Sequence, residues 1–177
     1  MSAQISITES QLVEDLAAFF KTLVDCEVVR GLPNQVPVPL RECIVITPMA
    51  ALGLSVPVMA YADPSPAAGK RTMTQATQWS ARVEGYGARA LDLALTLSIA
   101  LRSPYGCEFL GNLGRVQPLY AGELKQLPIE SVESQSFERW SFDAVLQFNP
   151  SITVPQQFAD QLHVGLIEVD TTYPTGA

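Results

Sequence analysis

The sequence has few charged residues, a single histidine and only three cysteines. Asp, Glu, Lys and Arg together make up 16% of its 177 residues, against roughly 25% in an ordinary soluble domain. A monomer needs solvated groups over its whole surface, so this shortage indicates that part of the surface contacts other protein. The composition therefore favours an obligate oligomer, although a large core in a compact monomer would shift it in the same way.

Clusters of basic residues are also lacking. Eleven Lys and Arg stand against eighteen Asp and Glu, which gives a formal net charge of −7. Tight binding to a phosphate backbone depends on clustered Lys and Arg, so the chain is a poor candidate for tight DNA binding, and only passage of DNA nearby without a grip stays compatible with this composition. We also expect no secretory signal and no membrane span, because no apolar run approaches the ~20 residues that a spanning helix needs.

The residues that carry chemistry form no recognisable active site. The only histidine, His163, lies in an expected strand, and no GxSxG motif occurs in the sequence. A pairing of His163 with Cys43 or Cys107 stays open, so a small Cys/His enzyme is kept as a lesser alternative. The three cysteines lack CxxC spacing and indicate buried free thiols, and with one histidine they are a weak zinc set. We therefore predict no catalytic residue, no cofactor and no metal.

One glycine motif resembles a nucleotide-binding turn. The segment Gly85–Ala90 matches GxGxxA, follows an expected strand and opens an expected helix. The preceding strand alternates polar and apolar residues, whereas the first strand of a dinucleotide-binding unit is buried on both faces. Glu108, the acid about twenty residues further on, stands in an apparent loop after Tyr105-Gly106-Cys107. A structural glycine turn is therefore favoured, and a small nucleotide-binding module is the alternative.

The acidic residues do not gather into a useful cluster. Glu14 and Asp15 lie on the polar side of an amphipathic helix, where we expect them to be solvated. Glu168 and Asp170 share one face of an expected strand, but two carboxylates alone make a weak cation site. We interpret that pair as a solvated edge.

Hydrophobic periodicity predicts an α+β fold in a single domain over residues 1–177. Thr8 and Gln11 form a capping box at the start of a helix over 9–25, and a second helix is expected over 88–102, ending before Pro104. The apolar stripe of this second helix is Leu91, Leu95 and Ile99. The two main helices should pack on a mainly antiparallel sheet. Its expected strands lie at 28–29, 43–47, 54–61, 72–85, 139–148, 151–154 and 162–169.

Two of these strands predict a long protruding β-hairpin over about 54–85. The strands at 54–61 and 72–85 flank a turn-rich tip, which is typical of a hairpin. Turn-rich residues between two strands have few contacts of their own, so we expect this tip to be mobile in a free copy. The tip residues are Asp63, Pro64, Ser65, Pro66 and Gly69.

The C-terminal segment, about 149–173, is predicted to contact a neighbouring subunit. Asn149 and Pro150 interrupt the strongest strand signal, and the residues that follow are apolar and poor in charge. An uncharged apolar edge needs cover, which a neighbour in a ring would provide. The alternative is that the segment completes the sheet of its own subunit. The proposed contact residues are Ile152, Val154, Phe158, Leu166, Val169 and Tyr173.

Several short segments, taken in order, resemble the phage neck or tail terminator proteins of tailed phages and prophages. Their order and spacing from Gly31 to Asp170 carry the resemblance, since each segment alone is weak. The segments are Gly31-x-x-Asn34-x-Val36-Pro37-x-Pro39, Ile46-Thr47-Pro48, Thr74-Gln75-x-Thr77-Gln78, Gly85-Tyr86-Gly87, Tyr105-Gly106-Cys107, Phe148-Asn149-Pro150, Val154-Pro155-Gln156-Gln157-Phe158 and Ile167-Glu168-Val169-Asp170.

The resemblance implies a structural virion protein without catalytic residues or cofactor. It implies a ring, usually of six subunits, that terminates the tail tube at its head-proximal end and joins it to the neck. The implied partners are further copies of the chain, the tail tube protein and the neck or connector proteins, with the sheath as a further candidate. DNA would pass through an acidic lumen without specific binding. The expected location is the tail or neck of the virion, and the host cytoplasm during assembly. Another head–tail connector, an adaptor or a tube subunit is the alternative in the same machine.

Overall fold

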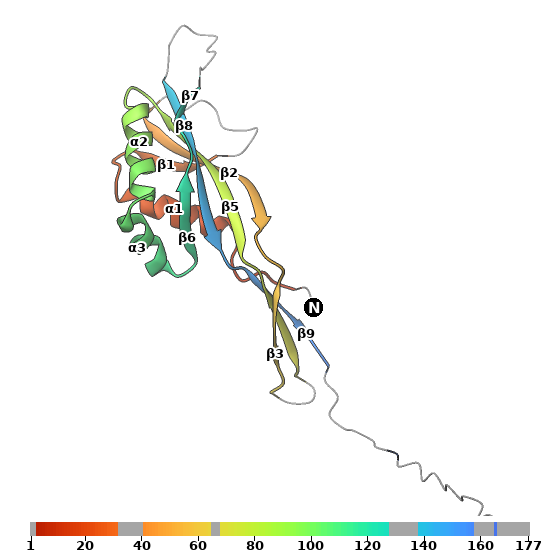
Figure 1. The fold of residues 1–177 in the computed structure, drawn as a ribbon. Coiled ribbons are helices and arrows are strands. Elements are labelled where there is room, and N and C mark those ends of the chain that lie inside the picture. Colours follow the sequence, from red (N-terminus) through yellow and green to blue (C-terminus); the bar gives the residue numbers. More distant parts are fainter. Residues whose placement is uncertain (1–2, 32–40, 65–67, 128–137, 158–164, 166–177) are drawn as a thin grey trace, which may run out of the picture.

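The computed structural model describes residues 3–31, 41–64, 68–127, 138–157 and 165. This part of the chain contains three helices and nine strands. The strands form two sheets, and the helices lie together on one face of the larger sheet (Figure 1). The predicted α+β class is confirmed. Three helices pack on the sheet where two main helices were expected.

The first helix, α1 (Glu9–Lys21), begins as the sequence predicts. The Thr8 side chain accepts a hydrogen bond from the Gln11 backbone N–H, and the Thr8 backbone N–H donates to Gln11 Oε1 at 2.8 Å. The helix ends before residue 25 because the Thr22 hydroxyl donates to the Phe19 carbonyl oxygen at 2.7 Å and closes the last turn. Its apolar stripe is buried as expected and consists of Leu12, Leu16, Phe19 and Phe20.

The larger sheet has the strand order β1-β2-β5-β8-β6, and the short strand β7 also pairs with β8. Only β1 and β2 run parallel, so the sheet is mainly antiparallel as predicted. The strands are β1 (Glu27–Arg30), β2 (Cys43–Gly53), β5 (Thr77–Tyr86), β6 (Val116–Ala121), β7 (Lys125–Gln126) and β8 (Arg139–Phe148).

The hydrophobic core lies between this sheet and the helices. Successive side chains of a strand point to opposite faces, so the alternation in β5 and β8 sends every second residue toward the helices. Register pairs across the two strands meet there, and all of their side chains are buried: Trp79 with Leu146, Ala81 with Ala144, and Val83 with Phe142.

The second helix, α2 (Ala90–Leu101), buries a different face from the one we predicted. Its buried residues include Leu93, Leu97 and Leu101. The predicted stripe points outward instead, with Leu91, Leu95 and Ile99 exposed by 38%, 42% and 61%. Both stripes are apolar with the same spacing, so periodicity alone does not determine which one meets the sheet.

Glu108 and the Tyr105-Gly106-Cys107 segment before it, interpreted from sequence as part of a loop, belong to a third helix, α3 (Pro104–Leu113). Pro104 ends α2 and also occupies the first turn of α3, where its missing N–H has no helical partner to lose. The Ser103 side chain caps this helix by accepting a hydrogen bond from the Gly106 N–H at 3.4 Å. Two glycines lower the helix propensity of the segment, so the sequence pattern did not predict a helix there. Strand β6 was likewise not predicted from the sequence.

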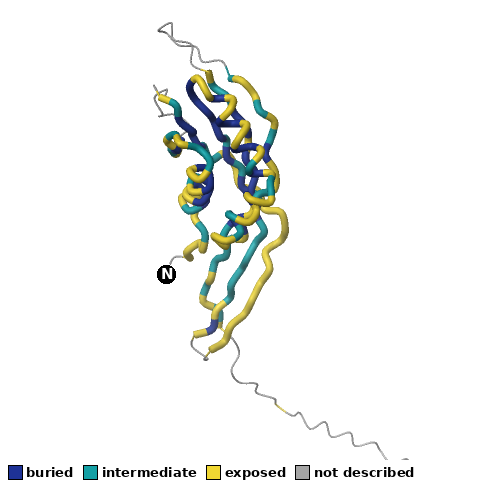
Figure 2. The backbone as a smooth tube through the Cα atoms, turned by 90° about the vertical axis from the view of Figure 1, so that its left-hand side faces the viewer, coloured by how far each residue is buried: buried dark blue, intermediate teal, exposed yellow. Residues whose placement is uncertain are grey.

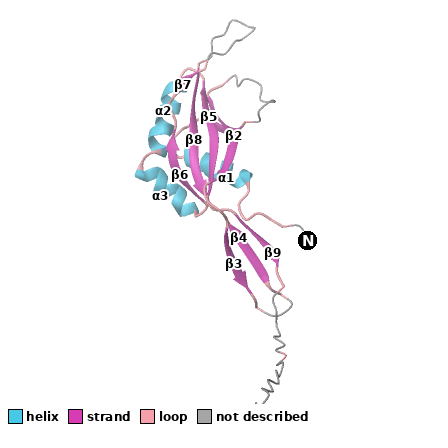
Figure 3. Ribbon diagram, turned by 45° about the vertical axis from the view of Figure 1, so that its right-hand side comes forward, coloured by secondary structure: helices cyan, strands magenta, loops and turns pink. Residues whose placement is uncertain are grey.

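A second sheet forms what is named here the arm. It consists of β3 (Val58–Ala62), β4 (Lys70–Thr74) and β9 (Ser151–Pro155) in the order β3-β4-β9, and both pairings are antiparallel. The arm extends beyond the end of the larger sheet, away from the helices (Figures 1 and 3). The strand predicted over 54–61 begins only at Val58. Residues 151–155 pair with β4 of their own chain, which was the alternative interpretation for this part of the C-terminal segment.

Burial divides the molecule in two. Buried residues gather in the larger sheet and the helices, whereas the arm consists almost wholly of exposed and intermediate residues (Figure 2). Every residue of β3 is exposed. The larger sheet and its helices, named here the body, therefore contain the core, and the arm has no core of its own.

Candidate assembly surfaces

The glycine turn Gly85–Ala90 connects β5 to α2 as a structural turn. Gly87 adopts a φ of 105°, a conformation that favours glycine. Strand β5 is antiparallel to both of its neighbours, β2 and β8, so it is not the first strand of a parallel βαβ unit. Glu108, which would serve as the ribose-binding acid, lies exposed on α3 and not at the end of a strand. The fold therefore gives no support to dinucleotide binding at this turn.

The cysteines occupy three different environments. Cys43 is buried on β2, and its burial raises the pKa of the thiol to about 11. Cys26 is half-buried and Cys107 is exposed on α3, so the expectation of buried thiols is wrong for Cys107. His163 lies outside the described residues. Within the described ranges, no three His, Cys, Asp or Glu side chains gather where they could hold a metal ion.

Asp15, which we expected to be solvated, is buried in α1. Only 3% of the residue is exposed, and its carboxylate pairs with Arg115 through two hydrogen bonds, from Nε to Oδ2 at 2.8 Å and from Nη2 to Oδ1. These bonds raise the pKa of Arg115 above its ordinary value. Glu14 beside it is exposed as expected, and Glu168 and Asp170 lie outside the described residues. The ion pair fixes α1 to the turn between α3 and β6.

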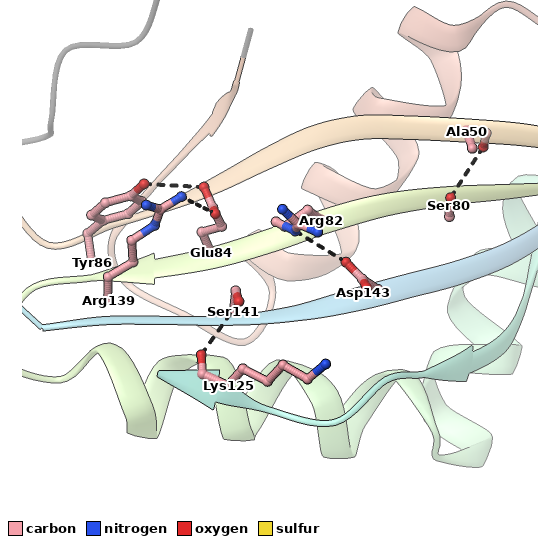
Figure 4. Close-up of polar contacts among 9 residues, drawn as sticks. All are labelled: Ala50, Ser80, Arg82, Glu84, Tyr86, Lys125, Arg139, Ser141 and Asp143. Carbon is pink, nitrogen blue, oxygen red and sulfur yellow. Dashed lines mark hydrogen bonds and ion pairs between the residues drawn. The ribbon is translucent and has the colours of Figure 1, made fainter. Parts of the chain in front are cut away.

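The face of the larger sheet opposite the helices carries a ladder of paired polar side chains (Figure 4). Arg82 of β5 and Asp143 of β8 are register partners, with Arg82 Nε 3.4 Å from Asp143 Oδ1. Near the end of β5, Glu84 accepts hydrogen bonds from Arg139 and from the Tyr86 hydroxyl, the latter at 3.2 Å. Burial, and then the nearby Glu84 carboxylate, raises the pKa of Tyr86 to about 12. Because these charges are matched across β5 and β8, the ladder stabilises their register.

Arg89 fixes the beginning of α2. Its guanidinium donates to Glu42 Oε2 at 2.7 and 3.0 Å and to Asp25 Oδ1 at 3.2 Å. The hydrogen bonds from Arg89 lower the pKa of Glu42. Glu42 directly precedes β2 and Asp25 lies just before β1, so this ion-pair cluster ties the start of α2 to the ends of the parallel pair of strands.

One face of the arm is mostly apolar and carries one charged residue, Arg71. The pairing register aligns Met59, Met73 and Ile152 across the three strands, and it aligns Tyr61, Arg71 and Val154 in the next rung. The opposite face carries small and polar residues, among which the Thr72 and Thr153 hydroxyls lie 2.9 Å apart. No described helix covers the arm (Figures 1 and 3). The name apolar arm face is used below for Met59, Tyr61, Arg71, Met73, Ile152 and Val154.

A second apolar surface lies on α2. Leu91, Leu95 and Ile99 stand one helical turn apart in a line along its exposed side, and they are named here the α2 stripe. Sequence reasoning identified these residues but expected them in the core. The sequence did carry a signal that one apolar side of this helix is exposed. The helix α2 is apolar around most of its circumference, and one helix cannot turn every side toward a single sheet.

Two of the six predicted contact residues lie in the described part of the chain. Ile152 and Val154 lie on the apolar arm face, and Phe158, Leu166, Val169 and Tyr173 lie outside the described residues. At the predicted tip, Asp63 and Pro64 are exposed, whereas Ser65 and Pro66 lie outside the described residues. Gly69 is buried, and its carbonyl oxygen accepts a hydrogen bond from the Gln156 N–H at 2.9 Å. Sequence reasoning missed the two arm methionines, because alternation gives the face of a residue but not what covers that face.

An α+β body that leaves apolar side chains uncovered on an arm and on a helix is typical of a structural protein that assembles with other chains. The chain matches the family described as phage neck terminator proteins over residues 10–174, and it belongs to that family. The resemblance drawn from the sequence is thereby confirmed. The family is structural, so the chain is assigned a structural role in the neck and tail of a bacteriophage.

A comparison with curated proteins found no match to this chain. In the described part of the chain, the helices are too short or too polar to cross a membrane.

Proposed function

We propose that this protein forms a ring at the head-proximal end of the phage tail, where it terminates the tail tube and joins it to the neck. The observation that carries the proposal is the apolar arm face, on which Met59 is 52% exposed. A single-layer sheet with an apolar face is stable only when another layer covers it, and within the described residues no such layer is present in one copy. The low charged fraction of 16% points in the same direction.

The ring consists of copies of this chain, and six is the number that the family resemblance implies. It assembles in the host cytoplasm and contacts the tail tube protein on one side and neck or connector proteins on the other, with the sheath as a further candidate. DNA passes through the lumen without specific binding, since the net charge is −7 and the basic side chains of the sheet ladder are paired with acids. The C-terminal segment 149–173 supplies part of the contact between subunits.

Light scattering on the purified chain, combined with electron images of the chain mixed with tail tubes, tests this function. We expect a ring-sized species, or a monomer that assembles as its concentration rises, and a ring at one end of each tube. Incorporation along the tubes would identify a tube subunit instead. Binding to the head portal alone would identify a connector. A tight monomer at high concentration that binds no tubes would contradict the proposal.

A further inference from the structure

We propose that the apolar arm face of one copy packs on the α2 stripe of the next copy in the ring. This inference rests on the proposed ring, and it names the two surfaces that join neighbouring copies. It concerns the described residues of the arm and of α2 only.

The arm supplies the first surface. Met59 and Tyr61 are exposed by 52% and 58%, although they share a face with four other side chains that are largely apolar. Strand β3 contains no charged residue, so the edge of this sheet lacks the charges that usually keep an open edge in water. Burying this face removes apolar area from water and thereby stabilises any contact that covers it.

The α2 stripe supplies the second surface. Leu91, Leu95 and Ile99 form a straight apolar line along a helix, and a helix lying on a sheet is one of the common ways in which two layers bury apolar faces. The ion pairs of Arg89 with Glu42 and Asp25 hold this helix in place, so the stripe is presented on a rigid element.

The two surfaces lie far apart within one copy. The arm extends beyond one end of the larger sheet, whereas α2 lies against the body beside the opposite part of β8 (Figures 1 and 3). A contact between them therefore joins two copies. Each copy offers one arm and one stripe, so the contact is head-to-tail, and contacts of this kind close into a ring when their rotation closes.

Charge complementarity supports the same pairing. The arm strands contain no acid, and Arg71 places a positive charge on the apolar arm face itself. On α2, Asp92 is exposed next to the stripe, and it has no ion pair among the described residues. A carboxylate beside the stripe can pair with the guanidinium of Arg71 on the neighbouring copy.

Disulfide trapping between copies tests this pairing in the full-length chain. In a Cys107→Ser background, a Met59→Cys chain is mixed with a Leu95→Cys chain, oxidised and separated by mass, while light scattering records assembly. The matched control replaces Met59→Cys by Ala60→Cys, which is adjacent in β3 but points to the opposite face of the arm. Met59, Ala60 and Leu95 are all exposed, so a cysteine at any of them removes no core contact. The Cys107→Ser chain, oxidised alone, measures any crosslinking through Cys26 and Cys43.

We expect a covalent dimer from the Met59–Leu95 mixture and only background dimer from the Ala60–Leu95 mixture. A ring that forms without the Met59–Leu95 crosslink would overturn the inference and leave the ring intact. Equal crosslinking in both mixtures, or dimers from the Met59→Cys chain alone, would also overturn it, the latter in favour of arm-on-arm packing. A crosslink without a ring would support the contact between arm and α2 stripe and contradict the proposed ring. If neither a crosslink nor a ring forms, both proposals are wrong.

Discussion

At the residue scale, buried acids are the most constrained groups of the body. Asp15 and Glu84 are exposed by only 3% and 5%, and each pairs with an arginine that lies far away in the sequence, Arg115 and Arg139 respectively. A buried carboxylate that loses its partner is strongly destabilising, so each pair fixes a junction between elements. Neither acid belongs to a cluster of potential metal ligands in the described residues. Their role is to hold the body together.

The turn at Gly87 gives a prediction at this scale. Gly87 and Gly114 both have positive φ, at 105° and 74°. An added Cβ at Gly114 meets nothing within 4 Å, so Gly114→Ala should cost only the backbone strain, about 1 kcal/mol. At Gly87 the new Cβ would also lie 2.6 Å from Glu42 Cγ, and Arg89 restrains that side chain. We expect Gly87→Ala to lower the urea midpoint of unfolding more than Gly114→Ala does. Equal midpoints for the two variants would contradict this account.

At the element scale, the arm combines strands from distant parts of the sequence. Strands β3 and β4 are neighbours in sequence, but β9 joins them only after β8 has returned through the body. The start of β9 is also bound by the N-terminal segment, since the Ser6 N–H donates to the Ser151 carbonyl oxygen at 2.9 Å. An element can thus complete its own sheet and still present a face to a neighbour, and Ile152 and Val154 are placed to do both.

Truncation tests the assembly role of the C-terminal segment. Among the described residues, the core of the body extends in sequence to Phe148, so a chain that ends at Asn149 should keep a folded, soluble body, measured by circular dichroism and cooperative thermal unfolding. It should lose ring formation in light scattering, because it lacks Ile152 and Val154 of the apolar arm face. A chain that ends at Gln157 is the matched control for β9 and should retain more assembly. Outright unfolding of the Asn149 truncation would mean that the segment belongs to its own core, and the prediction would be wrong.

At the scale of the whole molecule, the protein consists of a body that carries its own core and an arm that does not. In the described part of the chain, all the large side chains that are fully buried lie in the helices and strands of the body. Regions with few buried apolar contacts open more readily than a packed core. The body is therefore expected to be stable in a single copy, whereas the arm depends on what covers it.

Hydrogen exchange of the intact chain should reveal this division. In the isolated protein, we expect amides of β3 and of the flanking Asp63 to exchange much faster than those of β5 and β8, because every residue of β3 is exposed and β3 pairs with a single strand. On ring assembly, exchange in β3 should slow while exchange in β8 stays unchanged, which provides an internal control. Arm amides that are already as well protected as β8 in the monomer would show that the arm packs on its own chain.

Local patterns in the sequence were sufficient for several elements. The Thr8 capping box, the buried stripe of α1 and the alternation of β5 and β8 all follow from contacts within a few residues, and the structure confirms them. The same kind of information identified the turn at Gly87. The ordered short segments that resemble the phage neck terminators were also sufficient for the family, which the match over residues 10–174 confirms.

Only the tertiary structure decided which apolar and charged side chains are covered. Asp15 is buried because Arg115 reaches it from 100 residues away, and no local pattern contains that partner. The α2 stripe is exposed because the sheet accepts the other apolar side of the helix. The apolar arm face exists because β9 pairs with β4 across about half of the chain. The sequence determined which residues share a strand or helix face through near neighbours, but burial depends on distant partners that only the folded chain brings together.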